Sequence, residues 1–218
     1  MKLAEERKKI IDISNKLIEL GLIQDGHGNI SMYNQETGLA AITPSAVPYG
    51  ERDIEDICVV DLEGTIVEGN WKTTSETPLH LIYYKKRPDI TAVIHTHALK
   101  ATVFSVIGNE PMPMILNEAA MGIGGAVPIA PYARPGSEEL AEVTYNAVGK
   151  GIAAIMAHHG LITIGPTIEL AFAATVAVET TADTIIMARS MGIQPNTLDE
   201  NEVKVLREMY LKHKPRKA

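Results

Sequence analysis

The stretch Ala92-Val93-Ile94-His95-Thr96-His97 joins an apolar strand to two histidines, and it decides how the rest of the chain is interpreted. Side chains two residues apart on a strand point to the same face of the sheet. His95 and His97 therefore place two imidazoles side by side where the strand ends. Two neutral imidazoles at this spacing can chelate one divalent metal ion. Taken alone, the pair is equally consistent with two hydrogen-bonded histidines that hold no metal.

A second apolar run, Ile155-Met156-Ala157, leads into His158-His159-Gly160. Adjacent strand residues point to opposite faces, so we expect only one of these histidines to join the first pair. Gly160 allows the backbone to turn there and to approach a ligand closely. Three histidines with an open fourth position are typical of catalytic zinc, and the third histidine thus favours a metal site.

Two polar segments offer contacts for an anion. In Lys72-Thr73-Thr74-Ser75-Glu76-Thr77-Pro78, hydroxyls and backbone amides gather at the start of an expected helix, where phosphate binds readily. Glu76 next to a metal can act as a general base or as a displaceable fourth ligand, whereas alone it is an ordinary partner for the helix dipole. The loop Gly26-His27-Gly28-Asn29 is a weaker motif whose backbone N–H groups can reach phosphate oxygens. It matches neither the dinucleotide-binding pattern nor the P-loop.

Composition narrows the class of protein. The 218 residues are 45% hydrophobic and 22% charged, as in soluble globular domains. The net charge of −7 argues against a nucleic-acid partner. One cysteine, Cys58, excludes an intrachain disulfide and fits a reducing cytoplasm. The most apolar stretch, 170–188, is interrupted by Glu179 and Asp183, so we expect no membrane partner.

Periodicity and turn residues predict helices flanking a set of short strands. Helices are expected at about 3–20, 77–86, 98–107, from Ser137 onward, at 168–190, and from a Thr197/Glu200 capping box to about 212. Strands are expected at 30–33, 39–43, 57–61, 65–67, 90–97, 127–130, 153–158 and 161–164. The pattern predicts a single α/β domain of helix–sheet–helix layers, with strand direction left open.

Six motifs, taken in order, resemble the class II aldolase/adducin-head family, typified by L-fuculose-1-phosphate aldolase and L-ribulose-5-phosphate 4-epimerase. The resemblance runs from about residue 8 to residue 188. Its motifs are Gly28-Asn29-Ile30-Ser31, Ile42-Thr43-Pro44-Ser45, Thr74-Ser75-Glu76, His95-Thr96-His97, Ala130-Pro131-Tyr132 and His158-His159-Gly160-Leu161.

The resemblance implies a fold and a set of site residues. The fold is a single-domain, three-layer α-β-α structure with a central, mostly antiparallel sheet, spanning 1–218 with a basic tail at about 212–218. One Zn²⁺ per subunit is implied on His95, His97 and His159, with another divalent metal as an alternative, and a catalytic acid at Glu76. A phosphate pocket is implied at Gly28, Asn29, Ser45, Thr74 and Ser75. The family also implies a homotetramer with active sites between subunits.

The implied activity is that of a zinc-dependent aldehyde-lyase on a phosphorylated sugar. A ketose 1-phosphate is cleaved to dihydroxyacetone phosphate and an aldehyde through a metal-stabilised enediolate. A second acid, Glu118 or Tyr210 of a partner subunit, acts at the aldehyde oxygen. The chain departs from the aldolase pattern at Gly26, at Ala46, and in 115–119, where a tyrosine is replaced by Asn117 or Glu118. An epimerase, dehydratase or decarboxylase acting on a sugar or sugar-acid phosphate, and a non-catalytic adducin-like module, therefore remain alternatives.

Overall fold

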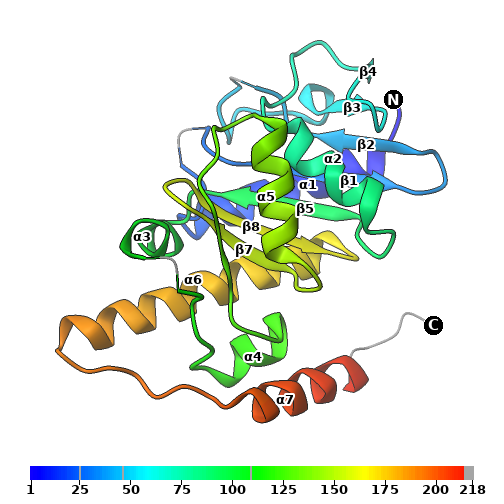
Figure 1. The fold of residues 1–218 in the computed structure, drawn as a ribbon. Coiled ribbons are helices and arrows are strands. Elements are labelled where there is room, and N and C mark those ends of the chain that lie inside the picture. Colours follow the sequence, from blue (N-terminus) through cyan, green and yellow to red (C-terminus); the bar gives the residue numbers. More distant parts are fainter. Residues whose placement is uncertain (25, 46, 109, 214–218) are drawn as a thin grey trace.

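The structure is a computed structural model that describes residues 1–24, 26–45, 47–108 and 110–213 (Figure 1). Ala46 and the tail residues Lys214, Arg216 and Lys217 lie outside the described residues. The expected phosphate-loop departure at Ala46 and most of the expected basic tail therefore stay sequence-based predictions.

Helices and strands occur close to the expected positions. The helices are α1 (Ala4–Glu19), α2 (Thr77–Lys86), α3 (Leu99–Ile107), α4 (Asn117–Ile123), α5 (Glu138–Val148), α6 (Ile168–Ser190) and α7 (Glu200–His213), with a 3₁₀ turn η1 (Ile54–Asp56). The strands are β1 (Asn29–Asn34), β2 (Leu39–Ile42), β3 (Cys58–Val60), β4 (Ile66–Glu68), β5 (Ala92–Thr96), β6 (Ile129–Ala130), β7 (Ala153–Met156) and β8 (Gly160–Gly165).

The eight strands form one sheet in the order β4-β3-β2-β1-β5-β8-β7-β6. All neighbours are antiparallel except β6 and β7, so the expectation of a mostly antiparallel central sheet is confirmed. In the register of the central strands, His95 at the end of β5 lies opposite Asn29 at the start of β1 and Ile162 of β8. The end of β5, the start of β1 and the start of β8 therefore meet at one edge of the sheet.

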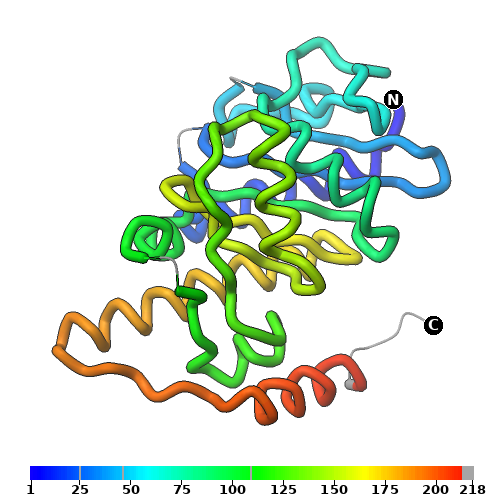
Figure 2. Tube along the Cα trace, viewed as in Figure 1, coloured from blue at the N-terminus to red at the C-terminus, as the bar shows by residue number. Residues whose placement is uncertain are grey.

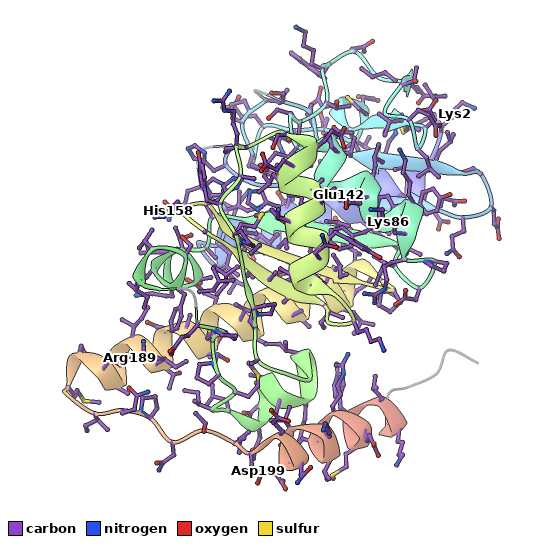
Figure 3. All side chains as sticks on the ribbon, viewed as in Figure 1. Lys2, Lys86, Glu142, His158, Arg189 and Asp199 are labelled. Carbon is purple, nitrogen blue, oxygen red and sulfur yellow. The ribbon has the colours of Figure 1, made fainter. Side chains whose placement is uncertain are left out.

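Helices cover both faces of the sheet, as the alternation of apolar residues predicted (Figure 1). On one face, Ile30 and Ile94 join a buried cluster with residues of α1, α3 and α6. On the other face, Val93 and Ile162 join a second buried cluster with residues of α2 and α5. Lys86 and Glu142 link α2 and α5 by an ion pair of 2.7 Å (Figure 3). The result is a three-layer α-β-α domain.

Helix α6 is long and apolar enough to cross a membrane by length and composition alone. In the structure it packs against β5 and β8, as the core helix of a soluble protein does. Its Glu179 carboxylate accepts hydrogen bonds from the backbone N–H groups of Lys100 (2.9 Å) and Ala101 (2.8 Å) at the start of α3. This acidic interruption of the apolar run thus anchors the helix that directly follows His97.

Two details differ from the sequence-based expectations. The short helix α4 was not expected, and it packs with α7 on the edge of the molecule (Figure 2). The start of α7 is capped by Asp199 rather than Thr197, because its Oδ1 accepts from the N–H groups of Asn201 (2.9 Å) and Glu202 (3.0 Å). Cys58 is fully buried.

Candidate metal centre and active site

Three histidines converge at the edge of the sheet where β5 ends and β8 begins. Their rings are arranged edge to face, with centroids 4.9 Å apart for His95 and His97, 4.8 Å for His95 and His159, and 5.0 Å for His97 and His159. One potential ligand atom from each lies within 4.8 Å of the other two. The structure therefore brings together the three residues predicted from the sequence.

The turn between β7 and β8 selects which of the adjacent histidines joins the cluster. His158 occupies the left-handed region, with φ of 57°, and its ring lies 6.1 Å from the ring of Tyr132. His159 then faces His95. Gly160 permits this arrangement, because a Cβ there would lie 2.5 Å from the backbone oxygen of Thr96.

Hydrogen bonding and burial prepare these imidazoles for a metal. The Nδ1–H of His95 donates to the backbone oxygen of Leu161 at 2.9 Å, which leaves Nε2 with its lone pair free to coordinate. Burial and the charge of His95 lower the pKa of His159 to about 4. Burial and the charges of neighbouring histidines lower the pKa of His97 to about 3. Nitrogen ligands of this kind, close together at one edge of the sheet, fit a zinc-type ion, and His95, His97 and His159 would hold it.

Glu76 faces the histidine cluster from the start of α2. It is the N-cap residue, yet its side chain makes no capping hydrogen bond. Its Oε2 lies 3.2 Å from Nε2 of His95, and its Oε1 lies 3.4 Å from Nε2 of His159. Burial raises the pKa of this carboxyl, but His95, the hydrogen bond from Asn29, and His159 outweigh that effect and lower it. Glu76 is therefore a buried carboxylate that faces two of the three histidines, where a carboxylate can exchange a proton with a bound molecule.

A polar pocket of about 220 Å³ opens beside the cluster. It is lined by all five predicted phosphate contacts, Gly28, Asn29, Ser45, Thr74 and Ser75, together with Glu76, His97 and His159. Gly28, at φ of 92°, brings its loop against the strand, since a Cβ there would lie 2.6 Å from the backbone oxygen of His95. The predicted anion contacts thus share one cavity with Glu76, His97 and His159, and its volume suits a small phosphorylated molecule.

Glu118 and Tyr210 lie elsewhere in the chain. They share a separate pocket of about 500 Å³ with apolar residues of α4 and α6, among them Phe172 and Val176. Neither residue lines the pocket at the histidines. Within one chain, the structure therefore does not bring the two predicted second acids to Glu76.

Sequence reasoning missed two buried polar residues behind Glu76. His80 and Tyr84 follow Glu76 at intervals of four residues, so all three lie on one face of the α2 segment. Both contact Ser31, and His80 also contacts Asn29. The polar spacing at i, i+4 and i+8 was the available signal.

A further contact involves a residue that lines the pocket, because the His27 ring stacks on the His97 ring with their centroids 5.3 Å apart.

Comparison with known proteins agrees with this geometry. Residues 8–186 match the family described as Class II Aldolase and Adducin N-terminal domain. A 5-deoxy-D-ribulose 1-phosphate aldolase of Bacillus thuringiensis serovar kurstaki is 36% identical over 210 residues, which cover 96% of this chain and 97% of that protein. An L-fuculose phosphate aldolase of Escherichia coli O6:H1 is 33% identical over 203 residues, which cover 93% of each chain.

The solved structure of an L-fuculose 1-phosphate aldolase superposes on this fold with a TM-score of 0.92. That match has 33% sequence identity and covers 97% of this chain and 98% of the other. Sequence relatives and overall fold therefore lead to the same group of enzymes. The chain belongs to the class II aldolase and adducin N-terminal domain family, and within it the chain is an aldolase.

Proposed function

We propose that the protein cleaves a ketose 1-phosphate to dihydroxyacetone phosphate and an aldehyde, with one Zn²⁺ held by His95, His97 and His159. The observation that carries this proposal is the position of Glu76. Its carboxylate lies 3.2 and 3.4 Å from two histidine nitrogens that face the metal position, next to a polar pocket of about 220 Å³.

The predicted phosphate contacts and Glu76 have separate roles in this reaction. When bound, the metal polarises the ketose carbonyl and stabilises negative charge on the substrate. Backbone and side-chain donors of Gly28, Asn29, Ser45, Thr74 and Ser75 hold the phosphate at the start of α2. After the C–C bond breaks, Glu76 relays a proton from solvent to the enediolate carbon to form dihydroxyacetone phosphate, and its carboxylate is ionised again. In synthesis, Glu76 removes that proton.

A second acid–base group must act at the other fragment. In cleavage it accepts the hydroxyl proton as the aldehyde forms, and in synthesis it returns that proton to the oxygen. Glu118 and Tyr210 are our candidates. Because both lie in an apolar pocket apart from the histidines, we infer that a neighbouring subunit supplies them in a homotetramer with active sites between subunits. The single buried cysteine, Cys58, fits a cytoplasmic location.

The substrate class follows from the named relatives and the size of the pocket. The 5-deoxyribulose and fuculose phosphates named for the relatives are short deoxyketoses, and each is named as a 1-phosphate. We therefore expect 5-deoxyribulose 1-phosphate or fuculose 1-phosphate to be cleaved.

The decisive experiment supplies zinc-loaded protein with these two ketose 1-phosphates and with ribulose 5-phosphate, and measures dihydroxyacetone phosphate with a coupled dehydrogenase. Release of dihydroxyacetone phosphate from a 1-phosphate supports the proposal. Epimerisation or dehydration without its release overturns the proposal in favour of another reaction on the same fold.

A further inference from the structure

A continuous chain of hydrogen bonds runs from Glu76 into the core between α2 and β1. Asn29 donates from Nδ2 to Oε2 of Glu76 at 2.9 Å. On its other side, Oδ1 of Asn29 lies 2.5 Å from Nε2 of His80. Nδ1 of His80 lies 2.6 Å from the Ser31 hydroxyl, which lies 2.5 Å from the hydroxyl of Tyr84. Five side chains are thus connected from end to end.

The Glu76 carboxylate, at the start of these hydrogen bonds, determines which group is the donor in each of them. An ionised carboxylate only accepts, so Asn29 must present its NH₂ group to Glu76 and its carbonyl oxygen to His80. That oxygen requires a donor, which places the imidazole proton of His80 on Nε2. Nδ1 then carries a lone pair and accepts from Ser31, and the Ser31 oxygen accepts from Tyr84. Each bond points toward Glu76.

Burial disfavours any other assignment of donors and acceptors. Asn29 is 5% exposed, and Ser31 and His80 are fully buried. A buried donor or acceptor left without a partner destabilises the fold, so reversing one group would be penalised at every following hydrogen bond. Burial also lowers the pKa of His80 to about 3, which keeps its imidazole neutral and able to accept from Ser31.

The chain of hydrogen bonds gives the two carboxylate oxygens of Glu76 different surroundings. Oε2 is held by Asn29, whereas Oε1 is buried, lies 3.4 Å from Nε2 of His159, and makes no hydrogen bond to the residues that the structure describes. Asn29 alone cannot maintain this difference, because a free amide can rotate. His80 prevents that rotation by donating to the amide oxygen. Oε1 therefore stays the oxygen that can carry the mobile proton.

We propose that His80 is a positioning residue that, acting through Asn29, orients the Glu76 carboxylate, with Ser31 and Tyr84 fixing the tautomer of His80. The proposal rests on the proposed function in so far as Glu76 is the proton-transfer group. It adds a role for three residues that do not reach the pocket. The same contacts give Asn29 a second task beyond binding phosphate.

The test compares four single variants as zinc-loaded, folded enzymes. His80→Leu removes the donor to Asn29, and we expect kcat to fall about 10–100-fold with KM nearly unchanged, as for partners of active-site ligands elsewhere. His80→Gln can still donate an N–H to Asn29, and it should recover most of that loss. Ser31→Ala should have an intermediate effect, and Tyr84→Phe, at the far end of the chain, the smallest.

A purely structural role gives a different result. His80→Leu and His80→Gln would then lower the melting temperature, but kcat per folded enzyme and KM would equal the wild-type values. This outcome overturns the proposal. Loss of zinc in His80→Leu, in proportion to lost activity, would also overturn it.

A readout without turnover separates this proposal from the proposed function. Nitrogen-15 NMR of histidine-labelled protein should show His80 as the neutral Nε2–H tautomer at neutral pH in the wild type, with a weakened preference in Ser31→Ala. An Nδ1–H tautomer or a charged ring in the wild type sinks the network, whatever the substrate. If the tautomer is as expected but no ketose 1-phosphate is cleaved, the proposed function fails and the network stands.

Discussion

His158 and His159 are neighbours in the sequence with different surroundings, and they form a matched pair for testing the metal site. We predict that His159→Ala loses bound zinc and that His158→Asn retains about one zinc per chain, as three-histidine sites hold. Asparagine suits the left-handed backbone of position 158, where φ is 57°. Metal analysis of the purified variants by mass spectrometry measures the outcome. Equal zinc in both variants would refute the assignment of ligands.

Glu76 provides the second prediction at the scale of a single residue. In Glu76→Gln the amide can no longer take a proton, so we expect proton exchange at the enediolate carbon of dihydroxyacetone phosphate to fall about 10²–10⁴-fold. The fold and most of the zinc should remain, because three histidines hold the metal. Solvent-deuterium exchange followed by NMR gives the rate.

The control for this variant is Glu142→Gln, which removes an exposed carboxylate that pairs only with Lys86 among the contacts described. It should exchange deuterium at the wild-type rate. Normal exchange in Glu76→Gln would assign the proton transfer to another group.

At the scale of elements, the sequence predicted most helices and strands because local signals and tertiary packing agree. The helix expected from Ser137 onward is α5, and Ser137 caps it by accepting from the N–H of Leu140. Helix α4 was missed because Asn117–Ile123 is short, contains Gly122 and gains its stability from packing against α7. Pairing of distant elements of this kind leaves no periodic signal in so few residues.

The junction of β5 and β8 gives a prediction that belongs to this scale. In Gly160→Ala the new methyl group would meet the Thr96 backbone oxygen at 2.5 Å and the rings of His95 and His97 at 3.3 Å. We expect a loss of about 1–3 kcal/mol in the free energy of unfolding, together with weakened zinc binding. Chemical denaturation and metal titration measure the two effects.

Gly125→Ala is the matched control, because a Cβ at Gly125 meets nothing within 4 Å. It should change the stability by less than about 0.5 kcal/mol, as for a substitution in open space. A Gly160→Ala protein as stable as this control, with full zinc, would show that the strands separate easily to accept a side chain.

For the whole molecule, sequence motifs indicated the histidine cluster and the residues of the polar pocket because both are short, local patterns. The three histidines and the five predicted phosphate contacts do converge in the structure. The buried hydrogen bonds from Glu76 to Tyr84 could not be predicted from the sequence, because they depend on how β1 packs beside α2. The position of Glu118 and Tyr210 relative to a second chain likewise depends on assembly, which no local pattern encodes.

A mixing experiment tests that assembly and the second acid together. Glu76→Gln lacks one proton-transfer group, and a Glu118→Gln/Tyr210→Phe double variant lacks both candidates for the other, so each protein alone should be nearly inactive. If sites form between subunits, co-expression in equal amounts should produce mixed tetramers in which about a quarter of the sites combine intact groups from two chains.

Aldehyde release by the purified mixed assemblies should then rise to about a quarter of the wild-type rate, because each restored site works independently. Mixing the two proteins after separate assembly is the control, since subunits that do not exchange restore nothing. If co-expressed chains also stay inactive, all groups must act within one chain, and neither residue is lent by a neighbour. If the double variant alone is active, Glu118 and Tyr210 are not the second acid. Activity that appears only after co-assembly leaves one explanation, because neither chain contains a complete set of proton-transfer groups: the reaction takes place across the contact between two copies of this chain.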